Sequence, residues 1–85
     1  MNRWSVTHTQ LKRLTPRVRR RIFTLFKRAH PRWRTATWDA LSCVVVGLER
    51  QLDVCARIGM KKQLLNRNLR YFRYFFWSMH TQGRL

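Results

Sequence analysis

The stretch TPRVRRRIFTLFKRAHPRWR, residues 15–34, combines eight Lys or Arg residues with a regular apolar series and no acid. Thr15 is a good helix N-cap and Pro16 suits the first helical position, while Pro31 pushes the residue before it out of the α region. Apolar residues recur at the spacing of one helix face: Val18, Ile22, Leu25, Phe26 and Ala29. The stretch therefore predicts a helix over about 16–29 with an arginine-rich outer face.

Two further apolar series follow, each at spacings of four and three residues. The first consists of Leu41, Val45, Leu48, Leu52 and Cys55. The second consists of Leu65, Leu69, Phe72, Phe76 and Met79. With Thr37 as an N-cap and Asp39 in the first turn, these series predict helices over about 37–57 and 62–79 that pair with each other.

Gly59 separates these two series, and glycine suits a helix C-terminus. A hairpin that turns there is the preferred interpretation, and one long bent helix is the alternative. Residues 1–14 show no sustained periodicity, so we expect a basic arm that is extended or partly ordered. The expected fold is all-α, a small three-helix protein with a single domain over 15–80 and a short polar tail over 81–85.

The charge balance is extreme, since 19 Lys and Arg residues oppose 3 Asp and Glu residues and the formal net charge is +16. Residues 1–38 and 54–85 hold no acid. A small domain with this charge repels itself, so we expect an anionic partner. Fifteen of the cations are Arg, whose guanidinium binds phosphate through two hydrogen bonds. The candidate RNA- or phosphate-binding residues are Arg17, Arg19, Arg20, Arg21, Lys27, Arg28, Arg32, Arg34, Lys61, Lys62, Arg67, Arg70 and Arg73.

Two stretches carry more apolar surface than a three-helix chain is expected to cover. Residues 38–48 are apolar nearly all round the predicted helix, and LRYFRYFFW (69–77) has aromatic residues outside the apolar series. Aromatic residues between arginines suit stacking on RNA bases, docking on proteins or contact with a membrane surface. The candidate protein-interface residues are Trp38, Val44, Val46, Tyr71, Tyr74, Phe75 and Trp77.

Patterns for catalysis or metal binding are absent from the sequence. Glu49 and Asp53 lie on a predicted helix beside two arginines, which is typical of surface ion pairs. Cys43 and Cys55 form no CxxC pair, and we expect them to be small packing residues. No apolar run reaches the roughly 18 residues of a membrane span. We therefore predict a protein that is not an enzyme, with no cofactor and no metal.

The acid-free, Arg-rich composition of residues 1–38 is that of a mitochondrial presequence. Because the chain begins at Met1, we expect this segment to be retained without cleavage. The expected location is the mitochondrial matrix or the matrix face of the inner membrane.

LFKRA (25–29) and IGMKKQLL (58–65) resemble segments of the LYR family of small, basic, three-helix mitochondrial proteins. Leu25, Phe26 and Lys27 take the three motif positions, although the motif itself has Tyr and Arg at the second and third. The resemblance implies binding to the mitochondrial acyl carrier protein and a role as an accessory or assembly subunit of a respiratory complex.

Together these features predict a non-catalytic structural subunit of a large assembly. The first expectation is a protein of the mitochondrial ribosome, which contacts rRNA through its Arg-rich first helix and docks on neighbouring proteins. The alternative is an accessory subunit of a respiratory-chain or ATP synthase complex, with its basic face toward lipid headgroups or acidic neighbours. A free-standing nucleic-acid-binding module is a third interpretation, although its exposed apolar surface would favour aggregation.

Overall fold

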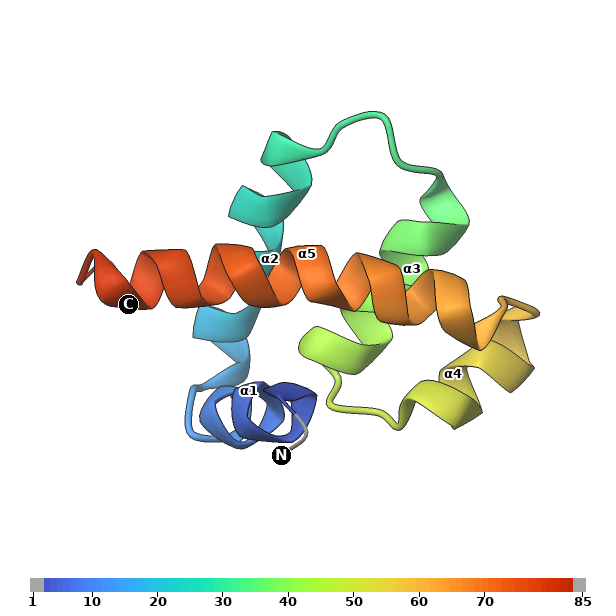
Figure 1. The fold of residues 1–85 in the computed structure, drawn as a ribbon, viewed down its shortest axis with the longest axis horizontal. Helices are drawn as coiled ribbons and strands as arrows, with labels where there is room; N and C mark the ends of the chain where they lie inside the picture. Colours follow the sequence, from blue (N-terminus) through green and yellow to red (C-terminus); the bar gives the residue numbers. More distant parts are fainter. Residues whose placement is uncertain (1–2, 84–85) are drawn as a thin grey trace.

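The computed structural model describes residues 3–83, which form five helices and no strand (Figure 1). The helices are α1 (Arg3–Lys12), α2 (Pro16–Ala29), α3 (Thr35–Val45), α4 (Gln51–Ile58) and α5 (Lys62–Thr81). The predicted all-α class is confirmed, whereas the predicted number of three helices is wrong. The radius of gyration of 12.1 Å matches the value of about 12 Å that is typical of a compact chain of this length.

The predicted first helix is α2, and the signals expected at both of its ends are confirmed. The Thr15 hydroxyl accepts a hydrogen bond from the backbone N–H of Val18 at 3.3 Å, and Pro16 opens the helix. The helix ends at Ala29, and His30 before Pro31 is its C-cap. These local signals position a helix whose inner residues, Ile22 and Phe26, are buried in the core.

The N-terminal segment is helical, so the expected extended or partly ordered arm is wrong from residue 3 onward. Trp4, Thr7 and Leu11 lie at helical spacing on one face of α1, and Thr7 and Leu11 are fully buried. The Thr7 hydroxyl accepts a hydrogen bond from the Trp77 indole N–H at 2.9 Å. A polar residue at the centre of the buried face interrupts the apolar pattern, which explains why periodicity alone missed this helix. Residues 1–2 and 84–85 of the predicted arm and tail lie outside the described residues.

The single helix predicted over 37–57 is two helices, α3 and α4, separated by residues 46–50. Leu48 has a φ of 59°, a left-handed conformation that a right-handed helix cannot continue through. Gly47 precedes it, and a Cβ there would lie 2.8 Å from the carbonyl oxygen of Cys43. Because of this break, Val54 and Cys55 are buried while Leu52 is exposed.

The start of α3 also differs from the prediction. The helix begins at Thr35 with Arg34 as its N-cap, and no acid lies in its first turn. Thr37 is a buried residue within the helix and not its cap.

The hairpin between α4 and α5 is confirmed. Gly59 has a φ of 79° and is the C-cap of α4. The backbone N–H groups of Gly59 and Met60 both donate to the carbonyl oxygen of Cys55, at 2.8 and 3.1 Å. A left-handed glycine that closes the last turn in this way is a usual helix stop, so the single long bent helix is excluded.

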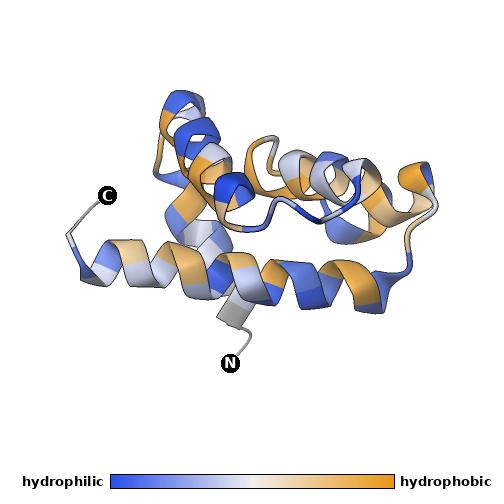
Figure 2. Ribbon diagram, turned by 90° about the horizontal axis from the view of Figure 1, so that it is seen from above, coloured by the Kyte–Doolittle hydropathy of each residue, from blue (hydrophilic) through white to orange (hydrophobic). Residues whose placement is uncertain are grey.

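The core lies between α5 on one side of the molecule and α2, α3 and α4 on the other (Figures 1 and 2). Its buried apolar residues are Leu11, Ile22, Phe26, Trp38, Ala40, Leu41, Val44, Val45, Val54, Cys55, Leu65, Leu69, Phe72, Phe76 and Met79. Most of α3 is in this set, because α2, α4 and α5 all contact it. The expectation that residues 38–48 need an outside partner is therefore corrected: this chain covers most of that stretch itself. Within residues 3–83, no helix combines the length and apolarity needed to cross a membrane.

Candidate nucleic-acid interface

The outer side of α2 is rich in cations. Five of its predicted phosphate-binding residues are exposed there, and with 3.6 residues per turn they fall on the side opposite Ile22 and Phe26. We call this set the α2 cationic face: Arg17, Arg20, Arg21, Lys27 and Arg28. From Arg17 to Arg28 the helix rises by about 17 Å. The face is therefore a strip of positive charge of about that length, with no acid in the helix.

Arg19 is the exception, and its assignment as a phosphate-binding residue is corrected. The side chain is only 9% exposed. Its Nη1 donates to the carbonyl oxygens of Leu14 at 2.6 Å and Leu11 at 3.3 Å, and its Nε donates to that of Val46 at 3.0 Å. These carbonyls lie at or just beyond the C-terminal ends of α1 and α3, where the helix dipole favours a cation. Arg19 thus joins α1, α2 and α3 inside the protein.

The other predicted cations lie in the loop after α2 and along α5. Arg32, Arg34, Lys61, Lys62, Arg67 and Arg70 are exposed, and Arg73 is half-buried. The guanidinium carbon of Arg73 lies 5.1 Å from the centroid of the Tyr74 ring, within the range of a cation–π contact. Most of the predicted cations thus lie in two places, α2 with its following loop and α5.

The predicted protein-interface residues fall into three groups. Trp38 and Val44 are buried in this chain's core, so their assignment to a surface is corrected. Val46, Phe75 and Trp77 are half-buried and pack against the core. Tyr71 and Tyr74 are the two that remain open, with 47% and 56% of their surface exposed.

Tyr71 belongs to a cluster of rings that the sequence did not predict. Its ring centroid lies 5.9 Å from that of Trp33 and 6.1 Å from that of His30, both from the loop after α2. His30 and Trp33 are themselves 4.7 Å apart. We call His30, Trp33, Tyr71 and Tyr74 the aromatic patch. Only the fold brings its two halves together, because residues 30–33 and 71–74 are distant in sequence.

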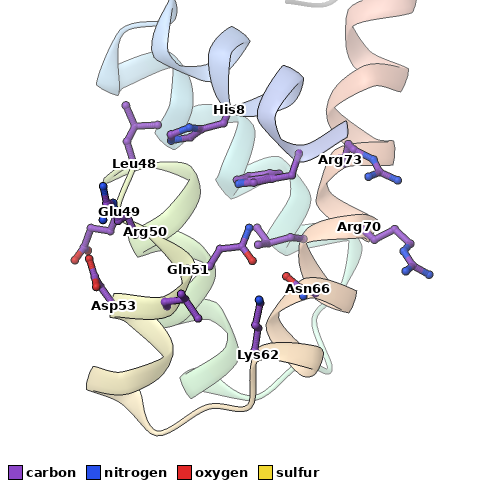
Figure 3. Close-up of a pocket in the computed structure, with 13 residues that line it drawn as sticks. His8, Leu48, Glu49, Arg50, Gln51, Asp53, Lys62, Asn66, Arg70 and Arg73 are labelled. Carbon is purple, nitrogen blue, oxygen red and sulfur yellow. The ribbon is translucent and has the colours of Figure 1, made fainter. Parts of the chain in front are cut away.

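A cavity of about 700 Å³ lies on another flank of α5, between α1, the loop after α3, and α4 (Figure 3). Its lining mixes acids, bases and apolar side chains: Trp4, His8, Leu48, Glu49, Arg50, Gln51, Leu52, Asp53, Lys62, Asn66, Leu69, Arg70 and Arg73. Lys62 extends into it from the start of α5, whereas Arg70 and Arg73 point away from it (Figure 3). Burial, followed by the charge of Lys12, lowers the pKa of His8, which favours the neutral imidazole. Opposite charges mixed in this way do not form a uniform anion site.

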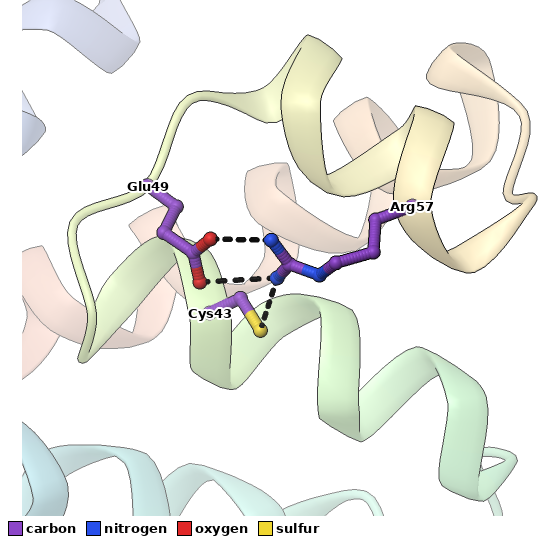
Figure 4. A network of polar contacts seen from close by, with 3 residues as sticks. All are labelled: Cys43, Glu49 and Arg57. Atoms are coloured by element: carbon purple, nitrogen blue, oxygen red, sulfur yellow. Dashed lines mark hydrogen bonds and ion pairs between the residues drawn. The ribbon is translucent and has the colours of Figure 1, made fainter.

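Glu49 forms the ion pair expected of the acids near α4 (Figure 4). Both of its carboxylate oxygens accept hydrogen bonds from Arg57, at 2.7 and 3.1 Å. The same guanidinium donates to the Cys43 sulfur at 3.2 Å. Arg57 lowers the pKa of the Glu49 carboxyl, while burial raises that of the Cys43 thiol. Glu49 is thus held as an ionised, fully paired carboxylate, a state that suits a structural ion pair.

Cys43 and Cys55 are both free thiols, and Cys55 packs in the core as predicted. Among residues 3–83, no group of three or more His, Cys, Asp or Glu side chains is placed to hold a metal ion.

No match to this chain was found among protein-family models, curated proteins or solved structures. The resemblance of residues 25–29 to the LYR motif therefore gains no support from the family comparison. In the structure Leu25 is half-buried, Phe26 is in the core and Lys27 is exposed.

Proposed function

We propose that the protein is a non-catalytic, RNA-binding structural subunit of a ribonucleoprotein, with the mitochondrial ribosome as the assembly that its composition favours. The observation that carries the proposal is the α2 cationic face: five exposed cations on a helix without acids. Two of the chain's three acids, Glu49 and Asp53, instead line the cavity beside α4. An anionic partner with regularly repeated charges best complements such a surface.

The way α2 is attached to the fold supports this function. Ile22 and Phe26 bury its inner side, and Arg19 ties it to the ends of two other helices. The cations are therefore presented by a helix that is already ordered, so binding does not need to order the backbone. Each Arg can grip a phosphate through two parallel hydrogen bonds, and each contact releases a condensed counterion.

The test is the salt dependence of binding between the full chain and a labelled RNA duplex, measured by fluorescence anisotropy. Each phosphate contact contributes about −0.9 to the slope of log K against log salt concentration. If all five cations of the face contact phosphates, the total slope is about −4 to −5. Arg20→Gln should reduce the size of that slope by about 1. Arg50→Gln is the matched control, because Arg50 is exposed at the start of α4, outside the α2 cationic face. If both variants reduced the slope equally, the attraction would be unspecific, and this result would contradict the proposal.

Anionic phospholipid vesicles complete the experiment. The second candidate function, an accessory subunit of a respiratory-chain or ATP synthase complex, places the same basic face against lipid headgroups or acidic neighbours. Vesicle binding that depends on Arg20, without comparable binding to RNA, would favour that candidate over the ribonucleoprotein.

A further inference from the structure

The aromatic patch is the most exposed group of rings in the described part of the chain. Tyr71 and Tyr74 lie one turn apart on the outer side of α5, and both are about half exposed. Trp33 extends the surface from the loop after α2, with its ring centroid 5.9 Å from that of Tyr71. Tyr71 and Tyr74 are thus presented to solvent beside the half-buried Trp33.

The rings behind this surface hold Trp33 in place. Trp33 stacks on the buried Trp38 at 4.9 Å, with an angle of 26° between the ring planes. The edge-to-face contact between Trp33 and the fully buried Phe26, at 5.5 Å, supports it from another side. A ring fixed in this way loses little conformational freedom when a flat partner packs on it.

Cations lie next to the residues of the aromatic patch along the chain. Arg32 and Arg34 flank Trp33 in the loop, and Arg67 precedes Tyr71 by one helical turn. Lys27 and Arg28, at the C-terminal turn of α2, lead directly into His30. The segments that build the patch hold no acid, since residues 1–38 and 54–85 lack Asp and Glu. The end of the α2 cationic face is thus continuous along the chain with the patch.

We infer that the aromatic patch stacks on unpaired bases, so the RNA is single-stranded or looped where it crosses α5 and the loop at 30–34. This inference rests on the proposed function and specifies its substrate class. In a duplex the bases cover one another's faces, whereas splayed bases can stack on aromatic side chains between phosphate-binding arginines. Tyr71 and Tyr74 supply the stacking faces, Trp33 extends them, and the adjacent cations hold the phosphates on either side.

The experiment compares a labelled 12-nucleotide oligouridylate with an RNA duplex of the same length, using the full chain. The double variant Tyr71→Leu/Tyr74→Leu keeps apolar surface without rings, and Tyr71→Phe/Tyr74→Phe keeps the rings without hydroxyls. Both residues are exposed, so neither variant should disturb folding, which circular dichroism will check. We expect the Leu variant to bind the single strand more weakly by about fivefold or more for each ring. Its affinity for the duplex should stay within about twofold, and the Phe variant should match the wild type.

Leu52→Ala is the control for loss of exposed apolar surface, because Leu52 is 63% exposed on α4, away from the patch. If the Leu double variant binds both RNAs like the wild type while Arg20→Gln weakens both, stacking is wrong and the proposed function stands. If the wild type binds neither RNA, the proposed function fails and this inference fails with it. Equal weakening of single-strand binding by the Phe and Leu variants would also overturn stacking, because it would assign the effect to the hydroxyls.

Discussion

At the scale of single residues, Arg19 shows how one side chain of a repeated type can have a different role from its neighbours. Arg17, Arg20 and Arg21 are exposed, whereas Arg19 is buried and donates three hydrogen bonds to backbone carbonyls. Its position one turn before Ile22 on the inner side of α2 explains the difference. A buried cation is tolerated here because the carbonyls at two helix ends surround it.

Replacing Arg19 by Met should therefore destabilise the fold without removing an RNA contact. The carbonyls of Leu11, Leu14 and Val46 would lose a charged donor, which predicts a loss of about 2–4 kcal/mol in the free energy of unfolding. The stability of Arg19→Lys should lie between those of the wild type and Arg19→Met, because an ammonium keeps the charge but lacks the planar fork of the guanidinium. Urea unfolding followed by circular dichroism measures the change. Arg17→Met, on the exposed side, is the control and should stay within about 0.5 kcal/mol of the wild type; a similar loss there would contradict the role of Arg19.

At the scale of helices, the two breaks around α4 have different origins. The break at 46–50 places a leucine in the left-handed region, which the surrounding packing must impose. The break at Gly59 uses the residue that adopts this conformation at least cost. The first break was therefore not evident from residue preferences, while the second was.

Gly59→Ala tests the hairpin at this scale. Nothing lies within 4 Å of a Cβ built at Gly59, so the expected cost is that of the left-handed backbone alone. Thermal unfolding should show a loss of about 1–2 kcal/mol. Gly59→Asn should lose less, because Asn tolerates this conformation better. If Ala were neutral, α4 and α5 would not depend on a left-handed cap at this position.

At the scale of the whole molecule, charge repulsion opposes the fold. The net charge of +16 is carried by a molecule of 36 × 29 × 22 Å. At 0.01 M salt the Debye length is about 30 Å, so nearly all of these charges interact, whereas at 1 M it is about 3 Å. Among the described residues, the ion pair between Glu49 and Arg57 is exposed and contributes little against this repulsion.

The free protein should therefore become more stable as salt is added, while its binding to RNA weakens. Each kcal/mol of relieved repulsion is expected to raise the Tm by about 4–8 °C in a domain of this size. Differential scanning fluorimetry between 0.01 and 0.5 M NaCl measures the shift. A Tm that falls with added salt would mean that attractive ion pairs, and not repulsion, dominate the surface.

The local signals of the sequence determined the all-α class, the ends of α2, the turn at Gly59 and the excess of positive charge. Caps, prolines and glycines act within a few residues, and charge is a property of composition, so none of these needs a tertiary context. Hydrophobic periodicity missed the buried face of α1 because the residue at its centre is the polar Thr7. The hydrogen-bond partner of Thr7 is Trp77, near the other end of the chain.

Only the tertiary structure decided which side chains are buried and which are presented together. Burial of Trp38 and Val44 depends on α2, α4 and α5 covering α3, and the role of Arg19 depends on where α1 and α3 end. The meeting of Trp33 with Tyr71 likewise follows from the packing of α5 across the other helices. Periodicity shows that a helix has an inner face, but only the arrangement of the other helices determines how much of the remaining surface they also cover.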